Sequence, residues 1–323
     1  MKLSMDPSVV PDLVNGQAKL VGQFESGSPE WHAARAVGLG GSEIAAVVAL
    51  SEWESYFSLY YRKKDKLRAI DESEPMKWGT LMEPVIYQEY VQNHMKKGLR
   101  MTTGHTFSHI DRPWQIANPD GLMWHGDELV DLLEIKNVGR PDFWGPDGSD
   151  VVPIYYRAQV SWYCDVLGLD KALIRCLISG NQPRTYRIKP STEDLEYLRE
   201  EGRKFIHALE NDIQPDLDGH MATYDAIKEM HPLIEDRVVQ VDPKLADRWW
   251  KVQTDLKAAE ERHLEVKNQI AMKMGLARIA MAGEQKVAYR QRPRGKGEPF
   301  VKSGVHPDKA STVIRKPKKK VAA

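Results

Sequence analysis

The amino-acid sequence predicts a mixed α/β fold, with a central mixed sheet, flanking helices and a helical C-terminal extension. Two observations predict this class. Helix-like segments precede and follow a run of short strand-like segments between residues 101 and 188. Further along, residues 242–274 place apolar side chains near a 3.5-residue spacing with many charges between them, which is typical of a long amphipathic helix or a helical pair.

Local signals place the individual elements. A helix is expected to begin at Ser28-Pro29-Glu30, with the serine as N-cap, and to break at the glycines from Gly38. The other expected helices cover residues 42–48, 55–66, 80–93, 153–167 and 192–211. The expected strands cover residues 101–110, 114–117, 121–125, 128–136, 171–179 and 184–188.

Size and composition limit the class of protein. The 323 residues are 41% hydrophobic and 28% charged, which suits one large domain or a core domain with a smaller one. No stretch approaches the roughly 18 apolar residues of a membrane helix, and the first residues lack the apolar run of a secretory signal. The two cysteines, Cys164 and Cys176, lack metal-site spacing, so we expect a reducing, cytosolic setting.

Composition shifts suggest four parts. We expect an irregular leader at residues 1–27, a core at 28–212, a helical extension at 213–285, and a basic hairpin and tail at 286–323. The net charge is zero, but Lys286 to Lys320 contains twelve Lys and Arg residues against two acids. Such a run can contact phosphates, or it can be a solvated tail without a specific role.

One constellation of charged residues has the pattern of a metal site. Asp120 lies in the turn Asn118-Pro119-Asp120-Gly121, and Glu134 and Lys136 end a strongly apolar strand. Residues two apart on a strand project to one face, and a neighbouring strand lies about 4.8 Å away, so Asp120 can approach Glu134. Two carboxylates with the Ile135 carbonyl form an oxygen site for Mg²⁺ or Mn²⁺. The alternative is an ordinary strand whose charges pair on a solvated face.

Five ordered blocks resemble the YqaJ-type viral recombinases, which are relatives of phage lambda exonuclease among the PD-(D/E)xK nucleases. The resemblance covers roughly residues 28–212. The blocks are Trp31-His32-Ala33-Ala34-Arg35 with Gly38 to Ile44, Trp78 to Pro84, Asn118 to Gly121, Leu133 to Lys136, and Tyr155 to Val160. The resemblance implies a restriction-endonuclease-like core, with Asp120, Glu134 and Lys136 at its metal and catalytic positions.

The same resemblance assigns further site residues. Glu83 matches a helix acid that faces the site, and Gln159 matches a helix amide beside it, with Tyr156 and Tyr163 on the same helical face. Arg35 matches a phosphate-contacting arginine. Ser42 follows three glycines at a helix start, where free N–H groups favour an anion. Arg35 and Ser42 are therefore candidates to hold a DNA 5′-phosphate, and a loop with an N-cap serine is the alternative. Tyr156 is a further candidate for phosphate or DNA contact.

Other residues are weaker candidates. Trp53 and Trp144 lie in expected loops and are candidates for DNA or partner contact, whereas Trp249 fits the apolar stripe of its helix and is expected in a core. Asp216, Asp218 and His220 suggest a second metal site, but the Pro/Gly-rich loop around them favours a linker.

The predicted function is Mg²⁺-dependent hydrolysis of DNA, with Glu83, Asp120, Glu134, Lys136 and Gln159 as the catalytic set. The resemblance implies a 5′-to-3′ exonuclease on duplex ends that makes single-strand tails for phage recombination inside a bacterial host cell. It also implies a ring-shaped homotrimer and a single-strand annealing protein as partner. The alternatives are an endonuclease of the same chemistry, a Cas4-like nuclease, which two isolated cysteines disfavour, and an inactive DNA-binding module. The basic tail and amphipathic helix are a candidate interface with the annealing protein.

Overall fold

A computed structural model describes residues 10–24, 27–36, 38–68, 70–103, 105–293 and 295–304. The first nine residues of the expected leader and the tail from residue 305 lie outside these described residues. Within them, the residues up to Pro232 form one compact unit and those from Leu233 form a second.

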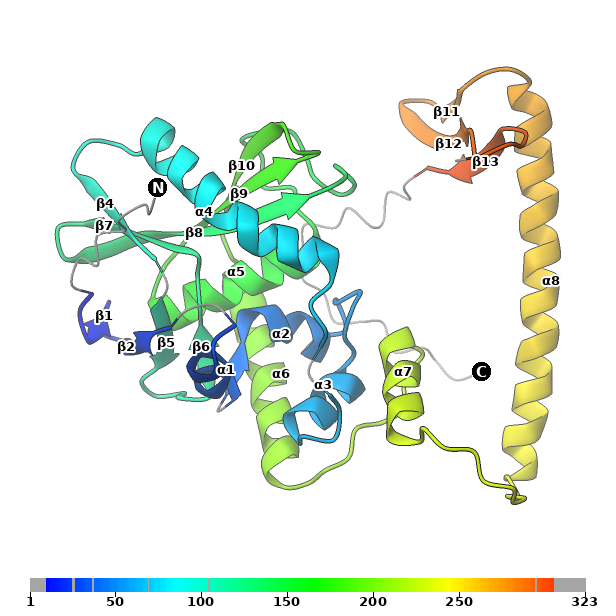
Figure 1. The fold of residues 1–323 in the computed structure, drawn as a ribbon, viewed down its shortest axis with the longest axis horizontal. Coiled ribbons are helices and arrows are strands. Elements are labelled where there is room, and N and C mark those ends of the chain that lie inside the picture. Colours follow the sequence, from blue (N-terminus) through cyan, green and yellow to red (C-terminus); the bar gives the residue numbers. More distant parts are fainter. Residues whose placement is uncertain are drawn as a thin grey trace. The chain divides into compact units, whose positions relative to one another are not determined.

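The central sheet of the first unit has five strands in the order β10-β9-β8-β7-β4 (Figure 1). Strand β8 pairs parallel with β9, and the other three pairings are antiparallel. The strands are β4 (Leu99–Thr102), β7 (Gly121–His125), β8 (Glu128–Val138), β9 (Ala172–Ile178) and β10 (Gln182–Ile188). The long strand β8 is central, and six of its eleven residues are buried, including Asp131 and Glu134.

A second sheet has the order β1-β2-β5-β6-β3. Its strands are β1 (Leu13–Val14), β2 (Ala18–Gln23), β3 (Leu39–Gly40), β5 (His105–His109) and β6 (Gln115–Ala117). The predicted strand 101–110 is therefore wrong as a single element, because its two halves pair with different sheets. Strands β1 and β2 also lie within the segment that was expected to be an irregular leader.

Seven helices of the described chain belong to the first unit. They are α1 (Pro29–Ala36), α2 (Gly41–Val47), α3 (Tyr56–Lys63), α4 (Glu74–His94), α5 (Ile154–Leu167), α6 (Thr192–Glu210) and α7 (Met221–Met230). Serine N-caps accept the backbone N–H three residues later at Ser55, Ser73 and Ser191. The cap at Ser73 starts α4 at Glu74, earlier than the predicted Thr80, and Gly168 ends α5 in the left-handed conformation.

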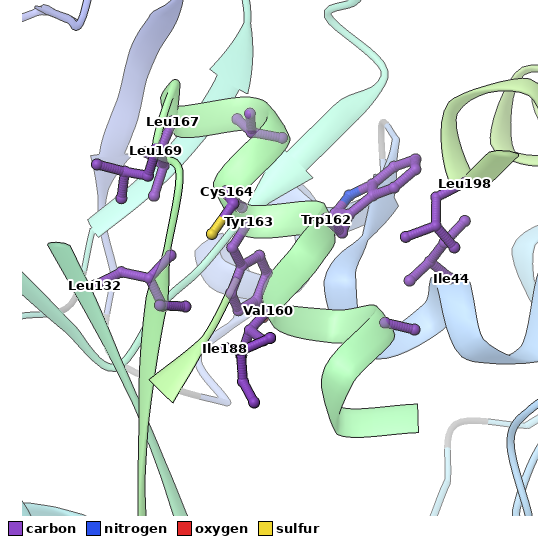
Figure 2. Packing of buried hydrophobic residues seen from close by; sticks show 14 of the residues in the cluster. Ile44, Leu132, Val160, Trp162, Tyr163, Cys164, Leu167, Leu169, Ile188 and Leu198 are labelled. Carbon is purple, nitrogen blue, oxygen red and sulfur yellow. The ribbon is translucent and has the colours of Figure 1, made fainter. Parts of the chain in front are cut away.

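The hydrophobic core forms around α5. Figure 2 shows Leu132 of β8 and Ile188 of β10 to one side of this helix, and Ile44 of α2 and Leu198 of α6 to the other. The Trp162 indole N–H donates to the carbonyls of Leu39 and Ile116, which ties α5 to strands β3 and β6. Helix α5 is therefore buried on several sides, and the polar residues that it carries must find partners inside the protein.

The second unit contains one long helix and a small sheet. Helix α8 (Pro243–Met274) begins at the Asp242 cap and is drawn as one long yellow helix (Figure 1). Strands β11 (Ile279–Ala282), β12 (Gln285–Gln291) and β13 (Phe300–Ser303) form an antiparallel sheet, which has one strand more than the expected hairpin. No described helix combines the length and apolar character that crossing a membrane requires. The predicted mixed α/β class with a helical C-terminal extension is confirmed.

Candidate active site

The hairpin of β7 and β8 positions the three residues of the predicted metal site. Gly121 stands opposite Leu133 in the antiparallel register, so Asp120, one residue earlier, reaches the part of β8 that holds Glu134. The Ile135 N–H donates to Asp120 Oδ2 at 2.6 Å. A side chain at Gly121 would have its Cβ 2.7 Å from the Met101 methyl group, so glycine permits this close approach. The turn thereby fixes the Asp120 carboxylate against the strand.

Glu134 lies at the centre of a buried hydrogen-bond network. Its Oε1 accepts from Lys136 Nζ at 2.6 Å and from Gln159 Nε2 at 2.6 Å. The other oxygen, Oε2, is buried and has no hydrogen-bond partner among the described residues. Glu134 is only 2% exposed. A buried carboxylate oxygen without a donor is costly, so this atom is a natural ligand for a cation.

The charges of this cluster do not balance. Burial, followed by the negative charges of Glu134 and Glu83, raises the pKa of Asp120 well above its ordinary value. Burial and the charge of Glu134 also raise the pKa of Glu83, on α4. Burial alone would lower the pKa of Lys136, but the neighbouring carboxylates raise it above its usual range. Three carboxylates therefore share one ammonium group.

The residues present fit a divalent cation bound mainly by oxygen. Asp120 and Glu134 supply carboxylates, Glu134 Oε2 has no other partner, and the excess negative charge favours a hard cation. No group of three His, Cys, Asp or Glu side chains in the described chain is close enough to hold a metal by itself. Two carboxylates with the predicted Ile135 carbonyl, completed by water, are therefore the candidate set. Magnesium sites commonly keep several waters in this way.

Helix α5 contributes the second part of the site. Gln159, which donates to Glu134, also approaches the Tyr163 hydroxyl at 3.1 Å. The Lys136 ammonium lies 4.9 Å from the centre of the Tyr156 ring, within the range of a cation–π contact. The spacing of Tyr156, Gln159 and Tyr163 places them along one face, as the sequence predicted. Tyr163, expected only to pack in the core, is thus also a hydrogen-bonded neighbour of the site.

The candidate phosphate-binding residues lie beside this helix face. A Cβ on Gly41 would sit 2.4 Å from the Tyr163 ring, so only glycine lets α2 pack this closely on α5. Arg35 donates to Ser42 Oγ at 2.5 Å, and its guanidinium lies 4.2 Å from the Trp31 ring centre. Burial first, and then the charge of Glu134, raise the pKa of Tyr163, while the positive charge of Arg35 opposes that rise. Arg35 and Glu134 therefore act on the same phenol.

Glu43 changes the expectation for the start of α2. Its carboxylate accepts the Gly40 N–H at 2.7 Å and pairs with Lys63 Nζ at 2.9 Å. One of the N–H groups that was expected to be free for an anion is therefore capped by the protein itself. The phosphate prediction now depends on the side chains of Arg35 and Ser42. The sequence Gly40-Gly41-Ser42-Glu43, with Glu three residues after a cap, is a signal that could have identified this role.

The structure corrects two expectations for tryptophans. Trp144 is only 8% exposed and packs between Tyr156 and Tyr186, so it is a core residue rather than a surface contact. Trp249, expected in a core, is 57% exposed. Trp53 is 64% exposed and makes an edge contact with Tyr155, which is next to Tyr156 in sequence. It stays a candidate for DNA contact.

The segment before α7 uses its polar residues locally. Asp218 accepts from the His220 N–H and the Thr223 hydroxyl, and His220 Nδ1 caps α7 by accepting from the Ala222 N–H. His220 and Asp218 thus have a structural role at the start of a helix. Because α7 belongs to the first unit, the compact unit continues past the expected core boundary at residue 212.

Comparisons with known proteins find a family model and a curated relative that resemble this chain. Residues 30–170 match the model of the YqaJ-like viral recombinase domain. A curated relative, the uncharacterized protein YqaJ of Bacillus subtilis (strain 168), is 23% identical over 275 residues, which cover 82% of this chain and 84% of the relative.

Two solved structures are also similar. An alkaline exonuclease from Laribacter hongkongensis has a TM-score of 0.45 and 21% identity, over 58% of this chain and 94% of that one. A phage-related exonuclease from Haemophilus somnus 129PT has a TM-score of 0.38 and 10% identity, over 55% and 95%. The match at residues 30–170 and the relative that spans most of its length show that the chain is similar to YqaJ-like viral recombinase domains.

Proposed function

We propose that the chain is a Mg²⁺-dependent deoxyribonuclease that degrades duplex DNA from its ends, 5′ to 3′, and so makes single-strand tails for phage-type recombination. The carboxylate cluster carries the proposal, because Asp120, Glu134 and Glu83 are gathered around one lysine and leave Glu134 Oε2 without a partner. The family match and the likeness to exonucleases support this kind of reaction.

In this proposal Asp120, Glu134 and the Ile135 carbonyl hold the cation. A bound Mg²⁺ would lower the pKa of a water and neutralise charge on the scissile phosphate. Gln159 holds the Glu134 carboxylate in place through its amide, and Tyr163 in turn contacts that amide. Glu83, whose pKa is raised, adds negative charge at the same point and is suited to hold a proton or a water.

Lys136 is suited to act as a cation rather than as a general base. Its pKa is raised by the carboxylates around it, so the side chain remains an ammonium group and is a poor general base. It is instead suited to orient a water or to stabilise negative charge that develops on the phosphate. The Tyr156 ring beneath it is a further contact for the ammonium group.

Arg35 and Ser42 are proposed to hold the 5′-phosphate of the DNA end. A forked guanidinium and a hydroxyl, already hydrogen-bonded to each other, can both donate to a phosphate. Gly41, next to Ser42, packs closely on Tyr163, and the Tyr163 hydroxyl accepts from Gln159, so the pair lies beside the helix face that carries the site.

The Arg35 assignment predicts a loss of end preference. Replacing Arg35 with Ala is expected to reduce the ratio of cleavage rates on 5′-phosphorylated and 5′-hydroxyl duplexes by roughly tenfold, since one charge-assisted contact is lost. Arg203→Ala, which removes an exposed arginine paired with Glu200 on α6, is the matched control. An unchanged ratio in the Arg35 variant would remove it from the phosphate role.

The test of the proposed function uses linear duplex DNA labelled at either the 5′ or the 3′ end, with closed circular DNA alongside. Early release of the 5′ label in Mg²⁺, with the circle intact, is the expected result. Cleavage of the circle would indicate an endonuclease of the same site chemistry. No cleavage in either Mg²⁺ or Mn²⁺ would leave an inactive DNA-binding module. The homotrimer and the annealing partner are further proposals that rest on the family alone.

A further inference from the structure

Helix α8 carries an apolar seam with strict seven-residue periodicity. Steps of four and three residues alternate along its length, and they lead from Leu245 to Ile270. The positions are Leu245, Trp249, Val252, Leu256, Ala259, His263, Val266 and Ile270. Seven of the eight are apolar. A seam of this period does not stay on one side of a straight helix, and it is the pattern of a helix that supercoils around another helix.

Within the second unit, the other described elements leave most of this seam uncovered. Leu245, Trp249, Val252, Leu256 and Val266 are each between 52% and 57% exposed. At the C-terminal end Met274 is buried, and contacts with β11 tie this end of α8 to the small sheet. Long helices in water gain most of their stability from packing an apolar face, and large exposed apolar surfaces mark interaction sites. A helix of 32 residues with an open seam therefore needs a partner.

The charged residues that flank the seam favour one orientation and register of a second copy of α8. Two parallel copies would bring Asp255 beside Glu260 of the other chain and Arg262 beside Lys267, which are both repulsive pairs. Two antiparallel copies centred between Lys257 and Ala258 would instead bring Asp255 beside Arg262 of the other chain, twice by symmetry. Shifting the antiparallel helices by one heptad in either direction places Arg262 beside Arg262 or beside Arg248. Only the antiparallel register centred between Lys257 and Ala258 thus combines full overlap of the seam with no like-charge contacts.

The apolar positions agree with the same register. Leu245 meets Ile270, Trp249 meets Val266, and Leu256 meets Ala259, so large side chains face smaller ones near the centre. Val252 meets His263, the one polar residue of the seam. Lys273, which would continue the seam, lies beyond the overlap. We propose that α8 binds α8 of a second copy of this chain as an antiparallel two-helix coiled coil. This inference does not depend on the nuclease activity.

Spin labels on single introduced cysteines test the geometry in the full-length protein. Both native cysteines are buried, so labels at Thr254→Cys and Asn268→Cys would dominate the signal. An antiparallel pair in this register offsets the two labels along the helix axis by about 10 Å at residue 254 and about 30 Å at residue 268, from the 1.5 Å rise per residue, so the label separation should be clearly longer at residue 268. Equal separations at both positions would establish a parallel pair. Absence of a defined separation at both would show that α8 does not bind a second copy.

Charge exchange provides an independent test on the same labelled proteins. Asp255→Arg and Arg262→Asp are each expected to weaken the paired population roughly tenfold, because each creates like charges twice by symmetry. The double variant should restore the pairing. Lys251→Glu, on the outward side of the helix, is the control and should leave it unchanged. A parallel pair would give the opposite result, since either single exchange would strengthen it. Because the exchanged charges lie on α8, association through other surfaces should not respond to the exchange.

Discussion

Two buried acidic clusters of the first unit differ in their balance of charge. Asp165 on α5 is surrounded by two arginines and an amide: it accepts from Arg112 at 3.3 Å, from Arg199 at 2.9 Å and from Gln115 at 2.7 Å. One carboxylate there meets two cations. At the β7–β8 hairpin three carboxylates meet one cation, and one carboxylate oxygen has no partner in the described chain.

This difference distinguishes charged residues that stabilise the fold from charged residues that are suited to bind a ligand. A cluster whose charged groups all have partners holds elements together and needs no bound ligand. The Asp165 cluster does this between α5, α6 and the segment at the start of β6. A cluster that keeps acids close together without enough donors is unfavourable unless something else binds. Both lie near α5, so burial alone does not distinguish them. The number of cationic and hydrogen-bonding partners for each carboxylate does distinguish the two clusters.

The largest expected effect is on catalysis. Glu134→Gln removes a charge and a candidate cation ligand from the unbalanced cluster, so DNA cleavage should fall by about 100-fold or more. The fold should persist, because an amide can still accept from Lys136 and Gln159. Rates of end-label release and DNA binding should be measured together, with Glu128→Gln, an exposed acid of the same strand, as control. Near-normal cleavage would contradict the site assignment.

The balanced cluster should respond in the opposite way. Asp165→Ala leaves Arg112 and Arg199 without their shared acid and removes four side-chain hydrogen bonds, one from each of Arg112 and Gln115 and two from Arg199. We expect a loss of about 3 kcal/mol in the free energy of unfolding, at the lower end for a buried pair because both arginines are partly exposed. Denaturant titration measures it, and Asp170→Ala is the exposed control. A loss of cleavage with unchanged stability would remove the distinction between the clusters.

Asp131 on β8 is a third buried acid, and it should make the free energy of unfolding depend on pH. Burial, only partly offset by Arg187, raises the pKa of Asp131 from 3.8 to about 6. A raised pKa means that stability is present below pH 4 and is lost as the pH rises through 6, by about 3 kcal/mol. Asp131→Asn lacks this loss, so the variant should be the more stable protein at pH 8 and should approach the parent near pH 4. A stability difference that does not change with pH would refute the assignment.

The smallest expected effect is on kcat, from a residue that positions Gln159. Tyr163→Phe keeps the ring that packs on Gly41 but removes the hydroxyl near Gln159. We expect kcat to fall about tenfold with little change in KM, as for other groups that orient a ligand through a neighbour. Tyr186→Phe, which loses a buried hydroxyl bonded to the Gly145 carbonyl, is the matched control. Equal kinetic losses in both variants would assign Tyr163 to general packing.

Local patterns predicted most elements of the core. Period-two alternation placed Glu134 and Lys136 on one face, and the proline and glycine signals placed α5 between Pro153 and Gly168. The approach of Asp120 to β8 followed from strand spacing alone. These features depend on residues that are close in sequence, which is why they could be predicted.

Features that depend on distant partners could not be predicted in this way. The division of residues 101–110 between two sheets follows from pairing with β7 on one side and β2 and β6 on the other. The burial of Trp144 requires Tyr186, and the role of Tyr163 requires Gly41 on another helix. The capping by Glu43 is an exception, because it depends only on a glutamate three residues after Gly40 and is therefore predictable from local sequence.

A calorimetric titration of Mn²⁺ into the full-length protein at pH 8 tests the central claim most directly, since it measures whether the excess of acid binds a divalent cation. The parent protein should bind Mn²⁺, and Glu134→Gln should lose most of that binding heat while Glu128→Gln retains it. Equal binding heats in the parent and in Glu134→Gln would contradict the account.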